Sequence, residues 1–315
     1  MSTAISTLGK SIDRVTIIGT GVMGTQVAWA CVAHGLCVTL YDIEQENAQH
    51  AERQVLAWLA EDKQRSTGPS IQGGTIQVAR TLKAAAQRAD LIFENVPEDA
   101  VIKRHVFREV ETSKLPDALI GSNASSLTWS HLASELRDPS RFFLLNFSPP
   151  RLHKLVEYMD GPMTTAHTRG SALTFARKIG MIPVVTRREI MGYIGNRIWR
   201  AIKKECLFLL DGDYALPDDI DRAFVLAQGT QLGPCALMDL VGLHSVLRVE
   251  EQYFAASQCE ADRPPRLLTE MVKRGKLGVS TGQGFYKYPG PSYERPGWLE
   301  GPLVPTYTSR SGTAS

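Results

Sequence analysis

The chain has 315 residues, of which 43% are hydrophobic and 22% charged, and its formal net charge is +2. These are globular values, and the near-neutral charge argues against nucleic-acid and membrane-surface binding. The five cysteines are scattered and odd in number, and no apolar stretch approaches about 18 residues, so we expect no disulfide framework, metal site or membrane span, and a cytoplasmic location.

The first predicted element is a strand that ends in a glycine-rich turn. Residues 15–24 read VTIIGTGVMG, so an apolar run stops at glycines in G-x-G-x-x-G spacing. The first glycine permits a tight turn, the second lets a pyrophosphate approach the backbone, and the third lets the following helix pack close to the sheet. The helix N-terminus favours phosphate through its free N–H groups and partial positive charge. The predicted cofactor contacts here are Gly19, Gly21, Val22, Met23 and Gly24.

A second predicted strand closes on an acid. The apolar run CVTLYD ends at Asp42, roughly the 20-residue distance at which an acid binds the ribose hydroxyls of a dinucleotide. This carboxylate would repel a 2′-phosphate, and no Arg or Lys follows it directly. The pattern therefore favours NAD over NADP.

Farther along, short apolar runs alternate with helix-like segments, which is typical of βαβ units and a parallel sheet. The expected strands are residues 15–18, 38–41, 91–94, 118–122, 142–147 and 184–185, with helices at 44–65 and 79–89 among them. After about residue 190 the apolar spacing becomes helical. We therefore expect an α/β fold, with a Rossmann-like NAD-binding domain over 1–190, an all-helical domain over 191–290 and a flexible tail over 291–315.

Six further segments occur in a fixed order after the glycine turn. They are LIFENVPEDAVIK (91–103), GSNASSL (121–127), RFFLLNFSPPRLHKLVEY (141–158), GYIGNR (192–197), LGPCALMDLVGL (232–243) and KLGVSTGQGFYKY (276–288). Together they closely resemble the 3-hydroxyacyl-CoA dehydrogenase family over roughly residues 13–288. The resemblance implies an NAD-dependent oxidoreductase that moves hydride between a 3-hydroxy group and the nicotinamide, and a homodimer formed through the helical domain.

The resemblance also assigns catalytic positions. The family pairs a histidine, which takes the hydroxyl proton, with a glutamate that orients it. The glutamate matches Glu157, but Asn146 stands at or next to the histidine position, in a segment one residue shorter than the family's. Ser125 and Asn196 match residues that face the reacting centre. Glu98 and Lys103 match residues that touch the ribose–nicotinamide part of NAD.

An amide at position 146 leaves three hypotheses open, because it neither accepts nor delivers a proton near neutral pH. The chain remains a dehydrogenase in which substrate, water or another residue handles the proton; or it binds NAD with weak or lost redox activity; or it catalyses a different NAD-dependent reaction. His153, four residues before Glu157, shares a face with it in a strand or a helix and is the nearest replacement, with a surface histidine as the alternative.

The stretch between Asp42 and Leu91 is shorter than the family's helix pair that helps to clamp CoA, and it contains breaks at Gly68-Pro69 and Gly73-Gly74. A weaker clamp favours a specialised acyl thioester or hydroxy acid over an ordinary β-oxidation substrate.

Overall fold

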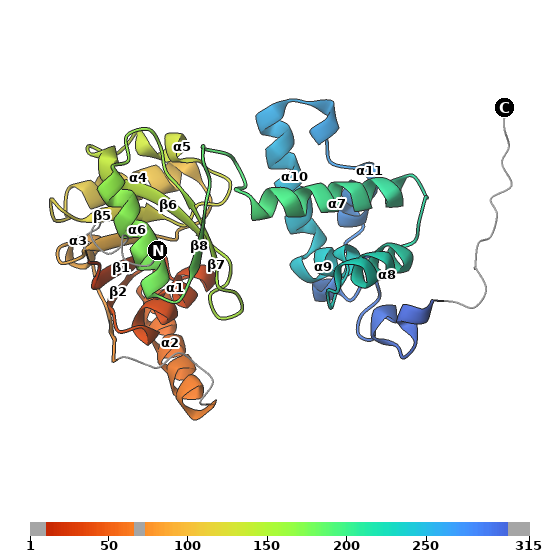
Figure 1. Ribbon diagram of the computed structural model, residues 1–315, viewed down its shortest axis with the longest axis horizontal. Coiled ribbons are helices and arrows are strands. Elements are labelled where there is room, and N and C mark those ends of the chain that lie inside the picture. The colour runs from red at the N-terminus through yellow and green to blue at the C-terminus, as the bar shows by residue number, and fades with distance from the viewer. Residues whose placement is uncertain (1–10, 66–72, 302–315) are drawn as a thin grey trace, which may run out of the picture. The chain divides into compact units, whose positions relative to one another are not determined.

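The computed structural model describes residues 11–65 and 73–301 (Figure 1). The chain divides into two compact units, Met1–Gly195 and Asn196–Ser315. The predicted break at Gly68-Pro69 and residues 302–315 of the predicted tail lie outside the described residues.

The first unit is built on an eight-stranded sheet of order β3-β2-β1-β4-β5-β6-β7-β8. Its strands are β1 (Arg14–Ile18), β2 (Cys37–Tyr41), β3 (Thr75–Val78), β4 (Leu91–Glu94), β5 (Leu119–Ser122), β6 (Phe142–Phe147), β7 (Leu155–Met159) and β8 (Ile182–Val185). Among these described strands, β6 and β7 pair antiparallel and every other neighbouring pair is parallel. The predicted Rossmann-like sheet is confirmed.

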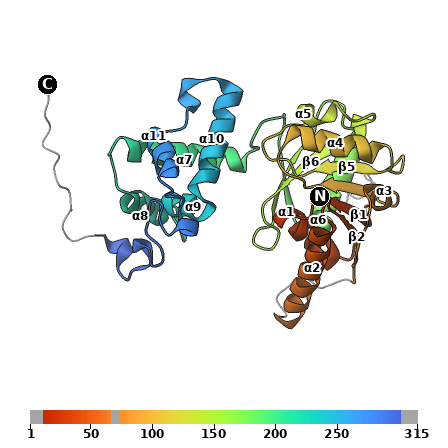
Figure 2. The same cartoon turned by 180° about the vertical axis from the view of Figure 1, so that it is seen from behind.

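Helices cover both faces of this sheet (Figures 1 and 2). Successive strand side chains point to opposite faces, so Phe142 and Phe143, both fully buried, enter different cores. One core packs against α1 (Val22–Ala33), α2 (Gln45–Arg65) and α6 (Ala166–Lys178). The other packs against α3 (Leu82–Ala86), α4 (Ala100–Glu111) and α5 (Trp129–Ala133). Burial on both faces explains the continuous apolar strand sequences.

The second unit is helical, as predicted. It contains α7 (Gly195–Asp211), which begins at the last residue of the first unit, and α8 (Pro217–Gln228), α9 (Pro234–Val241), α10 (Leu243–Ser257) and α11 (Arg266–Lys273). Its core contains fully buried side chains from α7, α9, α10 and α11, which are Leu207, Met238, Leu243 and Leu268 respectively.

The described part of the predicted tail contacts α8. Residues 291–301 include the short 3-10 helices η4 (Ser292–Glu294) and η5 (Trp298–Glu300). The Ser292 hydroxyl and the Trp298 indole N–H both donate to the Asp218 carboxylate at 2.6 Å. None of the described helices is both long and apolar enough to cross a membrane.

Candidate functional site

A cleft of about 940 Å³ lies at the carboxyl ends of β1, β2 and β4. The strand order reverses between β1 and β4, because the chain leaves β1 toward β2 and later returns to β4 on the other side. Open α/β sheets bind ligands at such a switch point. The cleft lining includes Gly19, Gly21, Asp42, Asn47, Asn95, Val96, Val101 and His105.

The glycine turn has the geometry that a dinucleotide requires. Gly19 has φ +85°, and a Cβ there would lie 2.7 Å from the Asn95 carbonyl carbon. A Cβ on Gly24 would lie 2.0 Å from the Gly19 carbonyl oxygen, so the helix could not start so close to the turn. A Cβ on Gly21 meets no atom within 4 Å, so this stretch of backbone borders open space that a pyrophosphate can enter.

The α1 N-terminus adds hydrogen-bond donors to this turn. Val22 and Met23 begin the helix after Gly21, and no described side chain caps it. Its first-turn N–H groups therefore stay available to an anion.

Asp42 lies just beyond β2 on the wall of the cleft. Its Oδ2 accepts hydrogen bonds from the Thr20 N–H at 2.8 Å and the Thr20 hydroxyl at 3.0 Å. Its Oδ1 accepts from the Glu44 N–H at 3.1 Å and the Asn47 amide at 3.3 Å. None of the described residues that line the cleft is Arg or Lys, so a 2′-phosphate would meet a carboxylate without a cation. The predicted preference for NAD fits this geometry.

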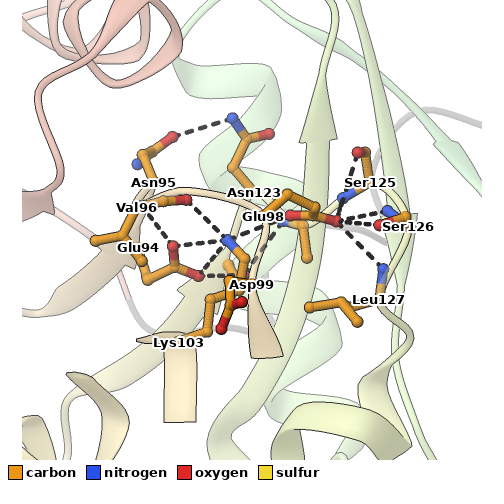
Figure 3. Close-up of polar contacts among 12 residues, drawn as sticks. Glu94, Asn95, Val96, Glu98, Asp99, Lys103, Asn123, Ser125, Ser126 and Leu127 are labelled. Carbon is orange, nitrogen blue, oxygen red and sulfur yellow. Dashed lines mark hydrogen bonds and ion pairs between the residues drawn. The ribbon is translucent and has the colours of Figure 1, made fainter. Parts of the chain in front are cut away.

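A buried ion-pair network joins the end of β4 to α4 (Figure 3). Glu94 ends β4 and is fully buried, and Lys103 of α4 is 1% exposed. The Lys103 Nζ donates to both Glu94 carboxylate oxygens, at 2.8 and 3.0 Å, and to the Val96 carbonyl at 3.2 Å. Burial raises the pKa of Glu94, and Lys103 and the Ser122 hydroxyl oppose that rise. The side chain of Lys103 is thus enclosed in this network.

Glu98 connects the network to the loop after β5. Its Oε2 lies 3.4 Å from the Lys103 Nζ. Its Oε1 accepts the N–H groups of Ser126 at 2.6 Å and Ser125 at 2.8 Å, as Figure 3 shows. Burial alone would raise the pKa of Glu98, but Lys103 and these N–H groups outweigh it and lower the pKa. An ionised Glu98 therefore holds the loop that carries Ser125.

Asn146 and Glu157 form a cross-strand pair. They are direct partners in the β6–β7 register, and the Asn146 Nδ2 donates to the Glu157 Oε2 at 3.3 Å. The other oxygen, Oε1, accepts the N–H groups of Ile194 at 2.9 Å and Gly195 at 2.8 Å. Glu157 is 4% exposed. The register places Asn146 opposite Glu157 despite the shortened segment between them.

His153 does not join this pair. It is exposed and lies before β7, where its N–H donates to the Pro149 carbonyl at 2.9 Å. Within the described residues no hydrogen bond or ion pair connects it with Glu157. The structure agrees with the alternative of a surface histidine, because His153 follows a turn and lies in neither a strand nor a helix.

Ser125 is held from a second side by the segment that precedes α7. Its carbonyl accepts the Gly192 N–H at 3.2 Å, and the buried Tyr193 hydroxyl donates to the Ala124 carbonyl at 3.0 Å. Asn196 is exposed and is the first residue of the second unit, so it is described only within that unit.

Three polar residues that the sequence interpretation missed help to organise the site. They are Glu94, Asn95 and Asn123. The Asn123 Nδ2 donates to the Asn95 Oδ1 at 3.0 Å, and its Oδ1 accepts the Phe147 N–H at 2.9 Å, so it links the ends of three strands. The sequence contained a signal for all three, because each lies at or directly after the end of an apolar run, as Asp42 does. Among the described residues, no cluster of three or more His, Cys, Asp or Glu side chains could hold a metal ion.

Comparison with known families gives two matches along the chain. Residues 14–190 match "3-hydroxyacyl-CoA dehydrogenase, NAD binding domain", and residues 192–288 match "3-hydroxyacyl-CoA dehydrogenase, C-terminal domain".

Individual relatives agree over most of their length. A "Probable 3-hydroxybutyryl-CoA dehydrogenase" of Bacillus subtilis is 29% identical over 88% of this chain and 98% of its own. The 5-formyl-3-hydroxy-2-methylpyridine 4-carboxylate 5-dehydrogenase of Mesorhizobium japonicum is 28% identical over 88% of this chain and 91% of its own. The crystal structure of the (S)-3-hydroxybutyryl-CoA dehydrogenase of Ralstonia eutropha superposes with a TM-score of 0.82 at 27% identity, covering 89% of this chain and 100% of that one.

Proposed function

Because this chain belongs to the 3-hydroxyacyl-CoA dehydrogenase family, we propose that it is an NAD-dependent oxidoreductase acting on a 3-hydroxy or 3-oxo acyl compound or a related hydroxy acid. The observation that carries the proposal is the cleft in which the open backbone at Gly21 and the carboxylate of Asp42 meet at the switch point of the sheet. NAD, when bound, supplies the nicotinamide that accepts or donates hydride.

The chain's own residues take separate roles in this proposal. The glycine turn and the α1 N-terminus bind the pyrophosphate, and Asp42 binds the ribose hydroxyls. By its match to the family sequence pattern, Glu98 is assigned to the ribose–nicotinamide part of NAD, and its carboxylate holds the loop of Ser125. Lys103 acts through Glu98, because its Nζ is enclosed between two carboxylates and a carbonyl.

We assign the substrate side to Ser125, Asn146, Glu157 and Asn196. Ser125 and Asn146 offer a hydroxyl and an amide to the reacting oxygen, and Glu157 orients Asn146. The role of Asn196 rests on its match to the family sequence pattern.

A second candidate function is NAD binding with lost or altered redox chemistry. One observation favours it: the partner of Glu157 is an amide, which cannot take the hydroxyl proton. General acid–base assistance is worth about 10²–10⁴-fold in rate, so its loss slows hydride transfer without removing cofactor binding.

The substrate that we propose lies outside ordinary β-oxidation. The relative from Mesorhizobium japonicum is named for a pyridine carboxylate, so proteins similar to this chain include one that is not named for a CoA thioester. A specialised acyl thioester and a free hydroxy acid both fit this proposal.

We further propose a homodimer formed through the helical unit, in the cytoplasm. The second unit exposes large apolar side chains, among them Leu226, Leu240 and Val241, each more than half exposed. All five cysteines are free thiols, which suits a reducing compartment. Light scattering after size exclusion tests the assembly: the wild-type chain should be a dimer and Leu240→Glu a monomer.

Two parallel measurements test the function. Calorimetry measures NAD binding, and absorbance at the NADH band follows turnover of (S)-3-hydroxybutyryl-CoA, free 3-hydroxybutyrate and a hydroxymethylpyridine carboxylate. NAD binding with turnover of one of them supports the dehydrogenase. Tight NAD binding without turnover supports the second candidate, and absence of NAD binding overturns both.

A further inference from the structure

The amide of Asn146 is held in one orientation. Glu157 accepts N–H groups from Ile194 and Gly195 on one carboxylate oxygen and from Asn146 on the other. A carboxylate offers only acceptors. If the Asn146 amide turned over, its Oδ1 would face the Glu157 Oε2 with no hydrogen between the two oxygens. The Nδ2 therefore faces Glu157, and the Oδ1 is left for another partner.

That Oδ1 is available to a ligand. It accepts no hydrogen bond from residues 11–65 or 73–301, and Asn146 is partly exposed. The β5–β6 register puts Ser122 opposite Leu144, so two residues further on Asn146 lies level with the loop that carries Ser125. The next residue, Phe147, is hydrogen-bonded to Asn123 in that loop. The acceptor thus lies at the strand edge that carries the other proposed substrate-facing side chain.

A histidine in the same place could serve both oxidation states of a substrate. A neutral imidazole that donates to Glu157 presents a lone pair to an alcohol, and an imidazolium presents an N–H to a ketone. Asn146 reproduces the first arrangement through its Oδ1, which occupies the place of the imidazole lone pair, while one of its two Nδ2 hydrogens is bound to Glu157. A carbonyl oxygen placed against the Oδ1 would leave two acceptors facing each other, which costs affinity.

We propose that Asn146, oriented by Glu157, selects substrates that present a hydroxyl donor at the reacting carbon, either an alcohol or the hydrate of an aldehyde, over ketones. This inference rests on the proposed function and narrows its substrate class. It concerns recognition by the chain's own residues and holds whichever group later receives the proton.

Binding measurements test the inference without turnover. Calorimetry on the full chain, with ADP-ribose filling the nucleotide cleft, compares (S)-3-hydroxybutyryl-CoA with acetoacetyl-CoA, and free 3-hydroxybutyrate with acetoacetate. We expect the hydroxy member of a pair to bind about tenfold more tightly than the oxo member, since one hydrogen bond is gained and one clash of acceptors avoided. Equal affinities overturn the inference and leave the proposed function standing. Binding of neither member of either pair overturns the inference for 3-hydroxy acids, whereas the proposed function is decided separately by NAD binding and by turnover.

Glu157→Gln supplies the sharpest variant. The N–H groups of Ile194 and Gly195 hold the new carbonyl oxygen, so the new amide N–H₂ faces Asn146 and turns its amide over. The group left for the ligand is then a donor, and the preference should reverse in favour of the oxo compound. A purely structural role of Glu157 would weaken both ligands alike, and that outcome contradicts the inference.

Two further variants complete the test. Asn146→Ala removes the acceptor and should bring the two affinities together; a preference that survives it overturns the inference even where Glu157→Gln does not fold. His153→Ala is the matched control, because this nearby side chain is exposed and has no hydrogen bond or ion pair to Glu157 in the described chain. It should leave the preference unchanged.

Discussion

The carboxylate of Glu157 accepts the backbone N–H of Gly195 at 2.8 Å, at the residue where α7 begins. The same oxygen accepts the Ile194 N–H, and the other accepts the Asn146 amide. One buried side chain therefore joins strands β6 and β7 to the segment that ends the first unit.

Removing this carboxylate should destabilise the protein. Glu157→Ala leaves three partly buried N–H donors without their acceptor. A fully buried orphaned donor costs about 1–3 kcal/mol, and a partly buried one costs less because water can reach it. We expect the free energy of unfolding in urea to fall by at least about 1 kcal/mol. Glu205→Ala, which removes an exposed carboxylate from α7, should change it by less than about 0.5 kcal/mol.

Restoring a base opposite Glu157 tests how much of the family chemistry remains. Asn146→His places an imidazole against the orienting carboxylate, and we expect oxidation of (S)-3-hydroxybutyryl-CoA to rise by about 10²–10⁴-fold. The gain should grow as pH passes roughly 6.5, where an unperturbed imidazole loses its proton and becomes a base. Stopped-flow NADH absorbance across pH measures it. No gain at any pH would show that the pocket differs in more than the base.

Asp42 should decide between the two nicotinamide cofactors. Asp42→Ala removes the acceptor of the ribose hydroxyls and the charge that repels a 2′-phosphate, so NAD affinity should fall about tenfold and NADP affinity should rise. Fluorescence titration measures both. Thr20→Val is the matched control, since it removes a hydroxyl bonded to Asp42 while keeping the carboxylate. Unchanged selectivity in Asp42→Ala would contradict the assigned role.

The strands that the sequence predicts well are those buried on both faces. The runs that became β1, β4, β5 and β6 are largely apolar and almost entirely buried because helices cover them on either side, whereas β2, also predicted, alternates between buried and partly exposed residues. The sequence interpretation missed β3, which lies half-buried at the sheet edge, and β7, where Glu157 interrupts an apolar run. The predicted helix at 79–89 is only Leu82–Ala86, since Thr81 caps its start.

The site was predictable where local sequence determines geometry. The glycine turn needs only its own spacing, so it could be predicted directly. The burial of Glu94 depends on the packing of α4, which no local pattern reveals. The enclosure of Lys103 in the same pocket has the same cause. The position of Asn146 opposite Glu157 could be fixed only from the β6–β7 strand register, because the shortened segment left the sequence alignment uncertain by one residue.

Substitutions at Lys103 and Glu94 should have coupled effects on stability, because the two side chains form a buried ion pair. Both side chains are buried, so Lys103→Met leaves the Glu94 carboxylate without its cation, at a cost of about 3–5 kcal/mol in the free energy of unfolding. Glu94→Gln in the Lys103→Met background removes that charge and should recover part of the loss. Urea unfolding of the two single variants and the double variant gives the coupling energy. Strictly additive effects would contradict a direct pair.

Asp90 should make stability depend on pH in the acid range. Burial alone would raise the pKa of Asp90, but the Arg14 side chain and the N–H groups of Arg14 and Asp13 outweigh it and lower the pKa. A carboxyl group with a lowered pKa in the folded state stabilises the protein above its unfolded pKa of about 3.9 and loses that contribution as pH falls through the folded value.

Asp90→Asn should therefore lower the free energy of unfolding at pH 7 by about 1–3 kcal/mol, because the amide keeps the shape but accepts the same N–H groups without charge. The difference from the wild-type chain should stay constant down to about pH 5 and shrink below about pH 4. Urea unfolding from pH 7 to pH 3 measures this. Asp117→Asn, at an exposed carboxylate whose ion pair with Arg141 lies at the surface, is the control and should show little difference at any pH. If the difference in the free energy of unfolding between the wild-type chain and Asp90→Asn grew toward acid pH, burial and not hydrogen bonding would dominate the pKa of Asp90.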